Sequence, residues 1–198
     1  MKQRRILLTI AGFDPLCSAG ICADVKVFAE RGFKPFAAIT CLTAQDAGGV
    51  KAVKPTDAGL LRDQLARLFA VAPVAGVKIG LVPDEPTAEI IKETLKGFGG
   101  EVVCDPVLGA SGGQPLVASD FNRWMPANLF SVSTVITPNE SEAERLFGDA
   151  AFREIFEMPQ IANGRLSAVL IKGIKFEDAR RGEKIISRYG IEVDLPHD

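Results

Sequence analysis

The sequence predicts a single α/β domain built on a largely parallel β-sheet. Strand-like and helix-like segments alternate along almost the whole chain, which is the pattern of strands joined by helical crossovers. The first strand-like segment is nearly all apolar, as expected of a strand buried on both faces of a parallel sheet. A length of 198 residues suits one domain better than two, so we expect residues 1–198 to fold as one unit.

The first half of the chain contains strands and helices in regular alternation. Residues 5–11 are β-rich and are closed by Gly12, and residues 18–31 repeat apolar side chains at helical spacing before Gly32. The other elements expected in this half are strands at 36–42 and 76–81, a short strand extension at 50–53, and amphipathic helices at 57–69 and 84–98.

The second half continues the alternation and then departs from it. The elements expected here are strands at 101–105, 132–137 and 166–172, and helices at 119–130 and 139–147. Right-handed crossovers of this kind place helices on both faces of the sheet. Residues 185–193 resemble an edge hairpin, and no helix-like segment follows to cover the last strands. We therefore expect an α/β fold whose C-terminal part is missing and whose last strands expose apolar surface.

The composition excludes several classes of protein. The chain has 23 Lys and Arg against 25 Asp and Glu, a net charge of −2, and a hydrophobic fraction of 47%, which excludes a disordered chain. Because there is no basic block, nothing favours nucleic acid or an anionic membrane as a partner. No apolar run approaches the roughly 20 residues that a membrane span needs.

The cysteines indicate reduced thiols and a cytoplasmic protein. Cys17, Cys22, Cys41 and Cys104 are too few for a disulfide scaffold. The separation of Cys17 and Cys22 does not match the usual zinc or redox pair, and the only histidine is His197. The sequence therefore disfavours a zinc site.

Polar side chains follow several of the predicted strands, where an open parallel sheet binds its ligands. These side chains belong to Asp14, Gln45, Asp105, Asn139, Glu142 and Lys172. Each has a simpler explanation on its own; Asn139, for example, can be a helix N-cap. Their repeated placement at one edge favours a site that holds a magnesium ion and a polyphosphate, because oxygen ligands suit the cation and an ammonium group neutralises phosphate charge.

Two common nucleotide-binding signatures are absent from the sequence. There is no G-x-x-x-x-G-K-[ST] phosphate loop. There is no G-x-G-x-x-G either, because the glycine after Gly12 is Gly20. A dinucleotide-dependent oxidoreductase is therefore disfavoured.

A series of short motifs occurs in one order along the chain, at residues 9–15, 19–24, 42–45, 77–81, 105–108, 111–113, 137–144 and 170–173. In these motifs the sequence resembles the hydroxymethylpyrimidine/phosphomethylpyrimidine kinases of thiamine biosynthesis, which belong to the ribokinase-like superfamily. The resemblance implies a ribokinase-like three-layer α/β/α fold with a mainly parallel central sheet. It also implies ATP-dependent phosphorylation of 4-amino-5-hydroxymethyl-2-methylpyrimidine and its monophosphate.

The resemblance also implies roles for individual residues. Those matching the pyrimidine contacts are Gly12, Asp24, Gln45 and Val107, and those matching the magnesium and ATP motif are Asp105, Asn139, Glu142 and Lys172. Of these, Asp105 and Glu142 match the metal-binding positions, Asn139 and Lys172 the nucleotide-binding positions, and Lys172 also the lysine that stabilises the transferred phosphoryl group. The implied cofactors are ATP and Mg²⁺, the implied partner is a small pyrimidine, and the implied assembly is a homodimer.

Departures from the family pattern leave two other functions open. Phe13 and Cys22 stand where the family usually has serine and glutamine, which allows a different hydroxymethyl substrate such as pyridoxal. The glycine-threonine-glycine turn followed by cysteine or aspartate, which carries the general base in the family, is absent from the sequence. No general base is therefore assigned, and a catalytically inactive pyrimidine-binding protein is the second alternative.

Overall fold

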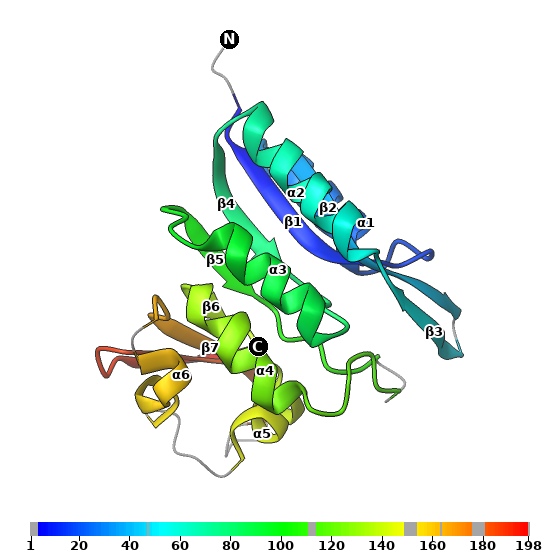
Figure 1. Ribbon diagram of the computed structural model, residues 1–198. Helices are drawn as coiled ribbons and strands as arrows, with labels where there is room; N and C mark the ends of the chain where they lie inside the picture. Colours follow the sequence, from blue (N-terminus) through cyan, green and yellow to red (C-terminus); the bar gives the residue numbers. More distant parts are fainter. Residues whose placement is uncertain are drawn as a thin grey trace.

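The strands pair into one continuous sheet (Figure 1). The computed structural model describes residues 4–46, 48–110, 114–148, 154–162, 164–175 and 181–197. The sheet formed by these described residues has nine strands, in the order β3-β2-β1-β4-β5-β6-β7-β8-β9. The strands are β1 Ile6–Phe13, β2 Lys34–Asp46, β3 Gly49–Pro55, β4 Val74–Ile79, β5 Glu101–Cys104, β6 Val135–Ile136, β7 Ala168–Lys175, β8 Arg181–Ser187 and β9 Glu192–Pro196.

Parallel pairing joins the central strands of this sheet. The run from β2 through β1, β4, β5 and β6 to β7 is parallel throughout. At the edges, β3 pairs with β2 and β8 pairs with both β7 and β9 in antiparallel fashion. The predicted α/β class with a mainly parallel sheet is therefore confirmed, and so is the edge hairpin near the end of the chain.

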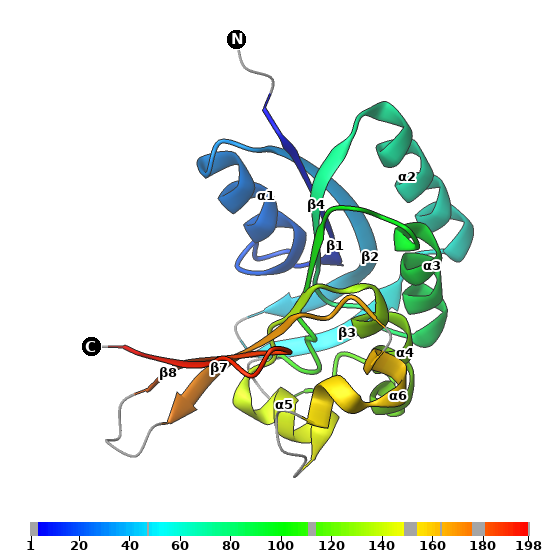
Figure 2. The ribbon, with the colours of Figure 1, turned by 90° about the vertical axis from the view of Figure 1, so that its left-hand side faces the viewer.

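Helices lie on both faces of the sheet but cover them unequally (Figure 2). The helices are α1 Gly20–Glu30, α2 Ala58–Val71, α3 Glu85–Leu95, α4 Phe121–Asn128, α5 Glu140–Phe147 and α6 Pro159–Ala162, with short 3-10 turns at Phe130–Val132 and Glu154–Glu157. α1 packs against β1 and β2 on one face, whereas α2, α3 and α4 lie side by side on the other. In the described part of the chain, α1 is the only helix on its face.

Side-chain caps start three of the helices where the sequence predicts them. Asp57 and Asp84 accept hydrogen bonds from the backbone N–H groups of the residues three positions later, at 3.0 Å in both helices. Asn139 forms a capping box with Glu142, in which each side chain accepts from the other's backbone N–H at 2.8 Å. Caps of this kind satisfy backbone donors that the helix leaves unpaired.

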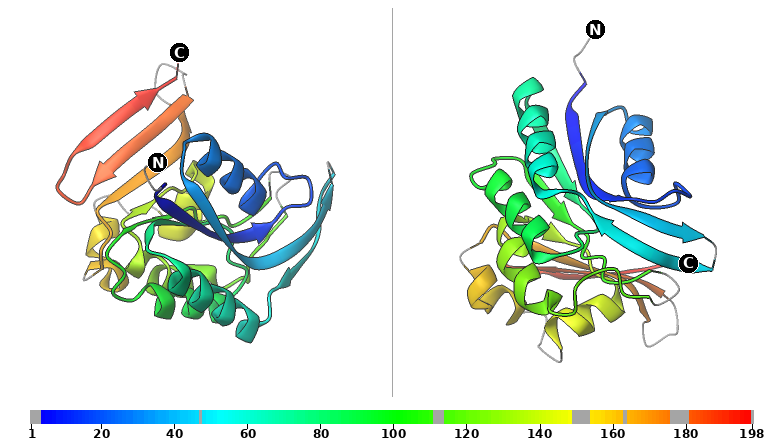
Figure 3. Two further views of the ribbon diagram at one scale, coloured as in Figure 1. Left: turned by 90° about the horizontal axis from the view of Figure 1, so that it is seen from above. Right: turned by 45° about the vertical axis from the view of Figure 1, so that its right-hand side comes forward.

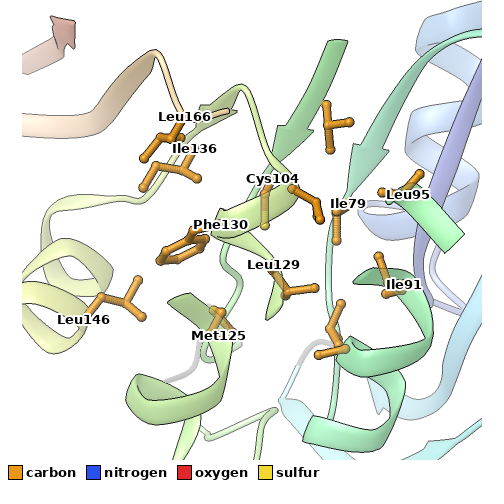
Figure 4. Close-up of a cluster of buried hydrophobic side chains, with 14 of the residues drawn as sticks. Ile79, Ile91, Leu95, Cys104, Met125, Leu129, Phe130, Ile136, Leu146 and Leu166 are labelled. Atoms are coloured by element: carbon orange, nitrogen blue, oxygen red, sulfur yellow. The ribbon is translucent and has the colours of Figure 1, made fainter. Parts of the chain in front are cut away.

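The main core lies between the sheet and the helices α3, α4 and α5 (Figure 4). Ile79, Cys104 and Ile136 are in register on β4, β5 and β6 and form one buried row. This row faces Ile91 of α3 and Met125 of α4, which are also buried. Since side chains alternate between the two faces of a strand, the residues flanking this row point to the face that carries α1.

The second strand is longer than the sequence suggests. The predicted strand at 36–42 and the extension at 50–53 are the two arms of one long hairpin, with Cys41 opposite Pro55 and Asp46 opposite Gly49. Gln45 therefore lies within β2, and the prediction that it follows the end of this strand is wrong. Backbone pairing with β3 and a hydrogen bond of 3.0 Å from the Thr43 hydroxyl to the Phe13 carbonyl keep this segment extended.

The strand predicted at 132–137 is much shorter in the structure, where β6 contains only Val135 and Ile136. Serine hydroxyls prolong the preceding helical turn instead. Ser131 donates to the carbonyl of Ala127 at 2.9 Å, and Ser133 donates to that of Leu129 at 2.7 Å. The backbone N–H groups of Val132 and Ser133 also bond to the carbonyls of Leu129 and Phe130, so the first residues of the predicted strand belong to the turn.

The strand β9 forms one edge of the sheet (Figure 3), and apolar side chains on it and just before it are exposed. The exposed fractions of Ile191, Val193 and Leu195 are 60%, 41% and 41%. This is the apolar edge that the sequence predicts for its last strands, and a homodimer stays a prediction. The described cysteines are free thiols, of which Cys41 and Cys104 are buried. None of the described helices is both long enough and apolar enough to cross a membrane.

Replacement of Gly20 by alanine is expected to destabilise the fold more than replacement of Gly32. Both glycines have positive φ, +59° and +82°, where an L-residue costs about 1–2 kcal/mol. A Cβ at Gly20 would lie 2.3 Å from the Gly12 carbonyl oxygen, whereas one at Gly32 meets no atom within 4 Å. Urea unfolding should show a loss of about 1 kcal/mol for Gly32→Ala and at least about 2 kcal/mol more for Gly20→Ala. Equal losses would contradict this packing.

Candidate functional site

A cavity of about 270 Å³ opens at the carboxyl ends of β1, β4 and β5. The four residues with predicted substrate contacts, Gly12, Asp24, Gln45 and Val107, all line this cavity. They come from β1, α1, β2 and the segment that follows β5. The fold thus brings together side chains that are far apart in the sequence.

The position of the cavity follows from the topology of the sheet. From β1 the chain moves outward to β2 and β3, and it then returns to β4 on the other side of β1. The order of strands therefore reverses between β1 and β4, and the cavity lies at the ends of these two strands. Open α/β sheets bind ligands at such a switch point.

The loop between β1 and α1 is built around the buried carboxylate of Asp14. One oxygen accepts from the backbone N–H of Leu16 at 2.8 Å, and the other accepts from the N–H groups of Ser18 and Ala19 at 3.0 Å. The Ser18 hydroxyl also donates to Asp14, at 2.7 Å. Burial alone would raise the pKa of Asp14, but hydrogen bonds from Ser18, Gln45 and the backbone outweigh it and lower the pKa to about 2. Asp14 therefore fixes the loop and restrains the side chain of Gln45.

A second carboxylate, that of Asp24, is held by side chains from two strands. Lys78 Nζ lies 2.8 Å and 2.9 Å from the two carboxylate oxygens. The hydroxyl of Thr9, on β1, donates to Oδ2 at 2.6 Å. The Asp24 and Lys78 side chains are 12% and 26% exposed, so this ion pair is largely shielded from water.

A third carboxylate connects the cavity to the neighbouring strands. Asp105 lines the cavity and accepts a hydrogen bond of 2.7 Å from Lys172 Nζ on β7. The hydroxyl of Thr137, directly after β6, lies 3.4 Å from the same oxygen. Lys172 itself does not line the cavity. Asp105 is therefore shared between the cavity and the edge where β6 and β7 end.

The two other predicted phosphate-site residues, Asn139 and Glu142, form the capping box of α5. Burial raises the pKa of Glu142; the N–H of Asn139 opposes this rise, nearby Asp105 adds to it, and Lys172 counteracts it. The carboxylate of Glu142 also accepts from the backbone N–H of Leu108, at 3.4 Å. Asn139 and Glu142 therefore have structural roles at the edge where Asp105 and Lys172 meet.

The residues present fit a magnesium ion that keeps most of its water. In the described part of the chain, no three side chains of the metal-ligating types cluster together. Asp105 is close enough to contribute to the raised pKa of Glu142, and both Glu142 oxygens already accept from backbone N–H groups. Mg²⁺ is typically bound through one or two carboxylates, several waters and substrate phosphates, which suits this pair.

Sequence reasoning did not assign functional roles to Thr9 and Lys78, which together hold Asp24. The signal for Lys78 is a lysine between the buried Val77 and Ile79 in an otherwise apolar strand. Nothing in the sequence distinguishes Thr9 from other strand threonines. The motif at 111–113 lies outside the described residues.

Comparison with known proteins identifies relatives along almost the whole chain. A family model described as phosphomethylpyrimidine kinase matches residues 14–190. The hydroxymethylpyrimidine/phosphomethylpyrimidine kinase of Rhizobium meliloti is 36% identical over 172 residues, which are 85% of this chain and 65% of that protein. The chain thus spans a little under two thirds of the length of this relative.

Solved structures agree with this match. A phosphomethylpyrimidine kinase from Clostridium difficile superposes with a TM-score of 0.83 at 29% identity, covering 98% of this chain and 85% of the other. A pyridoxal kinase from Bacillus subtilis in an ADP complex gives 0.81 at 27% identity, covering 99% and 76%. These matches confirm the ribokinase-like prediction, and the family model shows that the chain belongs to the phosphomethylpyrimidine kinase family.

Proposed function

We propose that the protein transfers the γ-phosphoryl group of ATP to 4-amino-5-hydroxymethyl-2-methylpyrimidine and to its monophosphate, in thiamine biosynthesis. The observation that carries the proposal is the position of Asp105. It lines the cavity that holds the predicted pyrimidine contacts, and it pairs with Lys172 at 2.7 Å on the side of the predicted phosphate site. The Asp105 carboxylate thus lies between the proposed pyrimidine site and the proposed phosphate site.

The cavity suits a small substituted ring. Its volume of about 270 Å³ lies just below the usual range for ligand pockets, which suits a small ring. Gln45 supplies an amide and Asp24 a carboxylate to the polar edge of such a ring. Gly12 lets this part of the cavity wall pack closely on the buried Cys41, because a Cβ there would lie 2.9 Å from Cys41 Sγ.

Catalysis by the described residues would depend on positioning and on charge neutralisation. Lys172 would hold the transferred phosphoryl group beside the cavity, and Asn139 would border the nucleotide at the start of α5. Asp105 and Glu142 would hold a hydrated Mg²⁺, which when bound neutralises negative charge on the phosphate oxygens. The three described cavity carboxylates, Asp14, Asp24 and Asp105, all accept hydrogen bonds within the protein, so we assign none of them as general base.

Pyridoxal phosphorylation is the second candidate, because pyridoxal kinases are among the similar structures. Pyridoxal also carries a hydroxymethyl group on a six-membered aromatic ring. The two rings differ in their polar edges, since the pyrimidine has an amino group where pyridoxal has none. Pyridoxal carries a phenolic hydroxyl instead, and we expect the Asp24 carboxylate to favour the amino group, which can donate an N–H to it.

Calorimetry and a turnover assay on the full chain test the proposal together. We expect the aminopyrimidine to bind more tightly than pyridoxal, and the phosphorylated pyrimidine to accumulate with ATP and Mg²⁺. Tighter binding of pyridoxal would favour the second candidate. Pyrimidine binding without any product would indicate the catalytically inactive binding protein, and binding of neither ring would contradict both kinase assignments.

Lys172→Met is expected to lower kcat by about a hundredfold or more, because it removes a charged donor from the proposed phosphoryl site. Calorimetric affinity for the pyrimidine should change little, since Lys172 does not line the cavity. Lys184→Met is the matched control: Lys184 pairs with Asp194 at 3.2 Å on the neighbouring strand, away from the cavity. A Lys172→Met variant with full kcat would exclude the proposed role.

Asp14→Asn is expected to cost about 1–3 kcal/mol of stability at pH 7, because the amide NH₂ would face backbone donors. The pKa of Asp14 is about 2 in the folded protein and ordinarily 3.8, so its ionised form stabilises the fold above about pH 3.8. This contribution is lost as the pH falls through about 2. The difference in unfolding free energy between wild type and variant should therefore shrink between pH 5 and about pH 2.

The control for this prediction is Asp57→Asn. Asp57 is the exposed N-cap of α2, and asparagine caps a helix about as well as aspartate. Chemical denaturation over the same pH series should show little change for this variant. A difference for Asp14→Asn that stays constant down to pH 2 would contradict the low pKa.

A further inference from the structure

Lys78 is a partly buried lysine in an otherwise apolar strand. It lies within β4 between the buried residues Val77 and Ile79, and its side chain is only 26% exposed. The side chain lines the substrate cavity and reaches Asp24 of α1, so it lies on the face of the sheet that carries this helix. A lysine in such a place needs a partner for its charge, and the partner is Asp24.

Lys78 and Thr9 together determine how the Asp24 carboxylate is presented. Lys78 Nζ contacts both oxygens, at 2.8 Å and 2.9 Å, which fixes the carboxylate plane relative to β4. The Thr9 hydroxyl, from a fully buried side chain on β1, contacts Oδ2 at 2.6 Å. Because α1 supplies Asp24 and two strands supply its partners, the carboxylate is held from three elements.

These contacts leave Asp24 with limited capacity for a ligand. A carboxylate accepts at about four lone-pair sites. The three contacts with Lys78 and Thr9 use three of them, so about one site remains. Asp24 lines the cavity, where a bound ring could donate a single N–H to that site.

We propose that Lys78 is a positioning residue, which with Thr9 orients Asp24 so that the cavity selects a ring with an amino group. The inference rests on the proposed function and names a feature of the substrate that this site recognises. Lys78 acts through Asp24 in this account. Its removal therefore weakens binding only of rings that donate to Asp24.

Calorimetry with two ligands tests this inference on the full chain. The ligands are 4-amino-5-hydroxymethyl-2-methylpyrimidine and the same ring with hydrogen in place of the amino group. We expect wild type to bind the amino ring at least about tenfold more tightly, because a hydrogen bond to a charged group is lost with the other ring. Lys78→Met should bind the amino ring about tenfold more weakly than wild type and the other ring equally well.

Further variants separate this role from a purely structural one. Lys78→Arg should restore most of the preference, and Thr9→Val should lose part of it. In an Asp24→Asn background, Lys78→Met should cause no further loss, because both changes remove the same interaction. Lys54→Met, at an exposed position on β3 outside the cavity, is the control and should bind as wild type does.

The outcomes distinguish this inference from the proposed function. If Lys78→Met weakens the binding of both ligands equally, Lys78 contacts the ligand directly or the variant is structurally impaired, and the inference is overturned. Unchanged binding of the amino ring to Lys78→Met would also overturn it. Weaker binding of both ligands by Lys78→Arg as well would exclude the positioning role. If wild type binds neither ring, the proposed function fails and the inference fails with it.

Discussion

Parallel pairing of β1, β4, β5, β6 and β7 is the constraint on which the site depends. Because these strands run in one direction, their carboxyl ends meet at one edge of the sheet. Lys78 and Asp24 are 54 residues apart in the sequence, and Lys172 and Asp105 are 67 apart, yet each pair is within hydrogen-bonding distance. The reversal of strand order between β1 and β4 then opens a cavity beside them.

Partners within the protein hold the carboxylates that line the cavity. Asp14 is held by backbone N–H groups, Asp24 by Lys78 and Thr9, and Asp105 by Lys172. Groups that are already oriented need little rearrangement when charge develops during a reaction, which is how positioned dipoles and ion pairs assist phosphoryl transfer. The same contacts stabilise the loops at the sheet edge.

The spacing of apolar residues and the polar residues after the strands predict much of this structure. Which side chains pair with one another depends on the tertiary fold. The apolar run before Gly12 and the helix starts at Asp57, Asp84 and Asn139 follow from local preferences, and the structure agrees with them. The placement of Gln45 within a hairpin depends on pairing with β3, which leaves no local signal. The contact of Lys78 and Thr9 with Asp24 is tertiary: the lysine stands out in an apolar strand, but nothing local indicates which carboxylate it pairs with. Before β6, the hydroxyls of Ser131 and Ser133 donate to backbone carbonyls of the preceding turn, and the residues that look strand-like in the sequence do not form a strand.

A crystal structure of the full chain with the aminopyrimidine and a non-hydrolysable ATP analogue tests the central claim most directly. The account predicts the ring in the 270 Å³ cavity between Asp24 and Gln45, with its hydroxymethyl group toward Asp105. It also predicts the terminal phosphate within hydrogen-bonding distance of Lys172 Nζ. A ring bound elsewhere on the surface, or phosphates directed away from the ends of β5, β6 and β7, would contradict it.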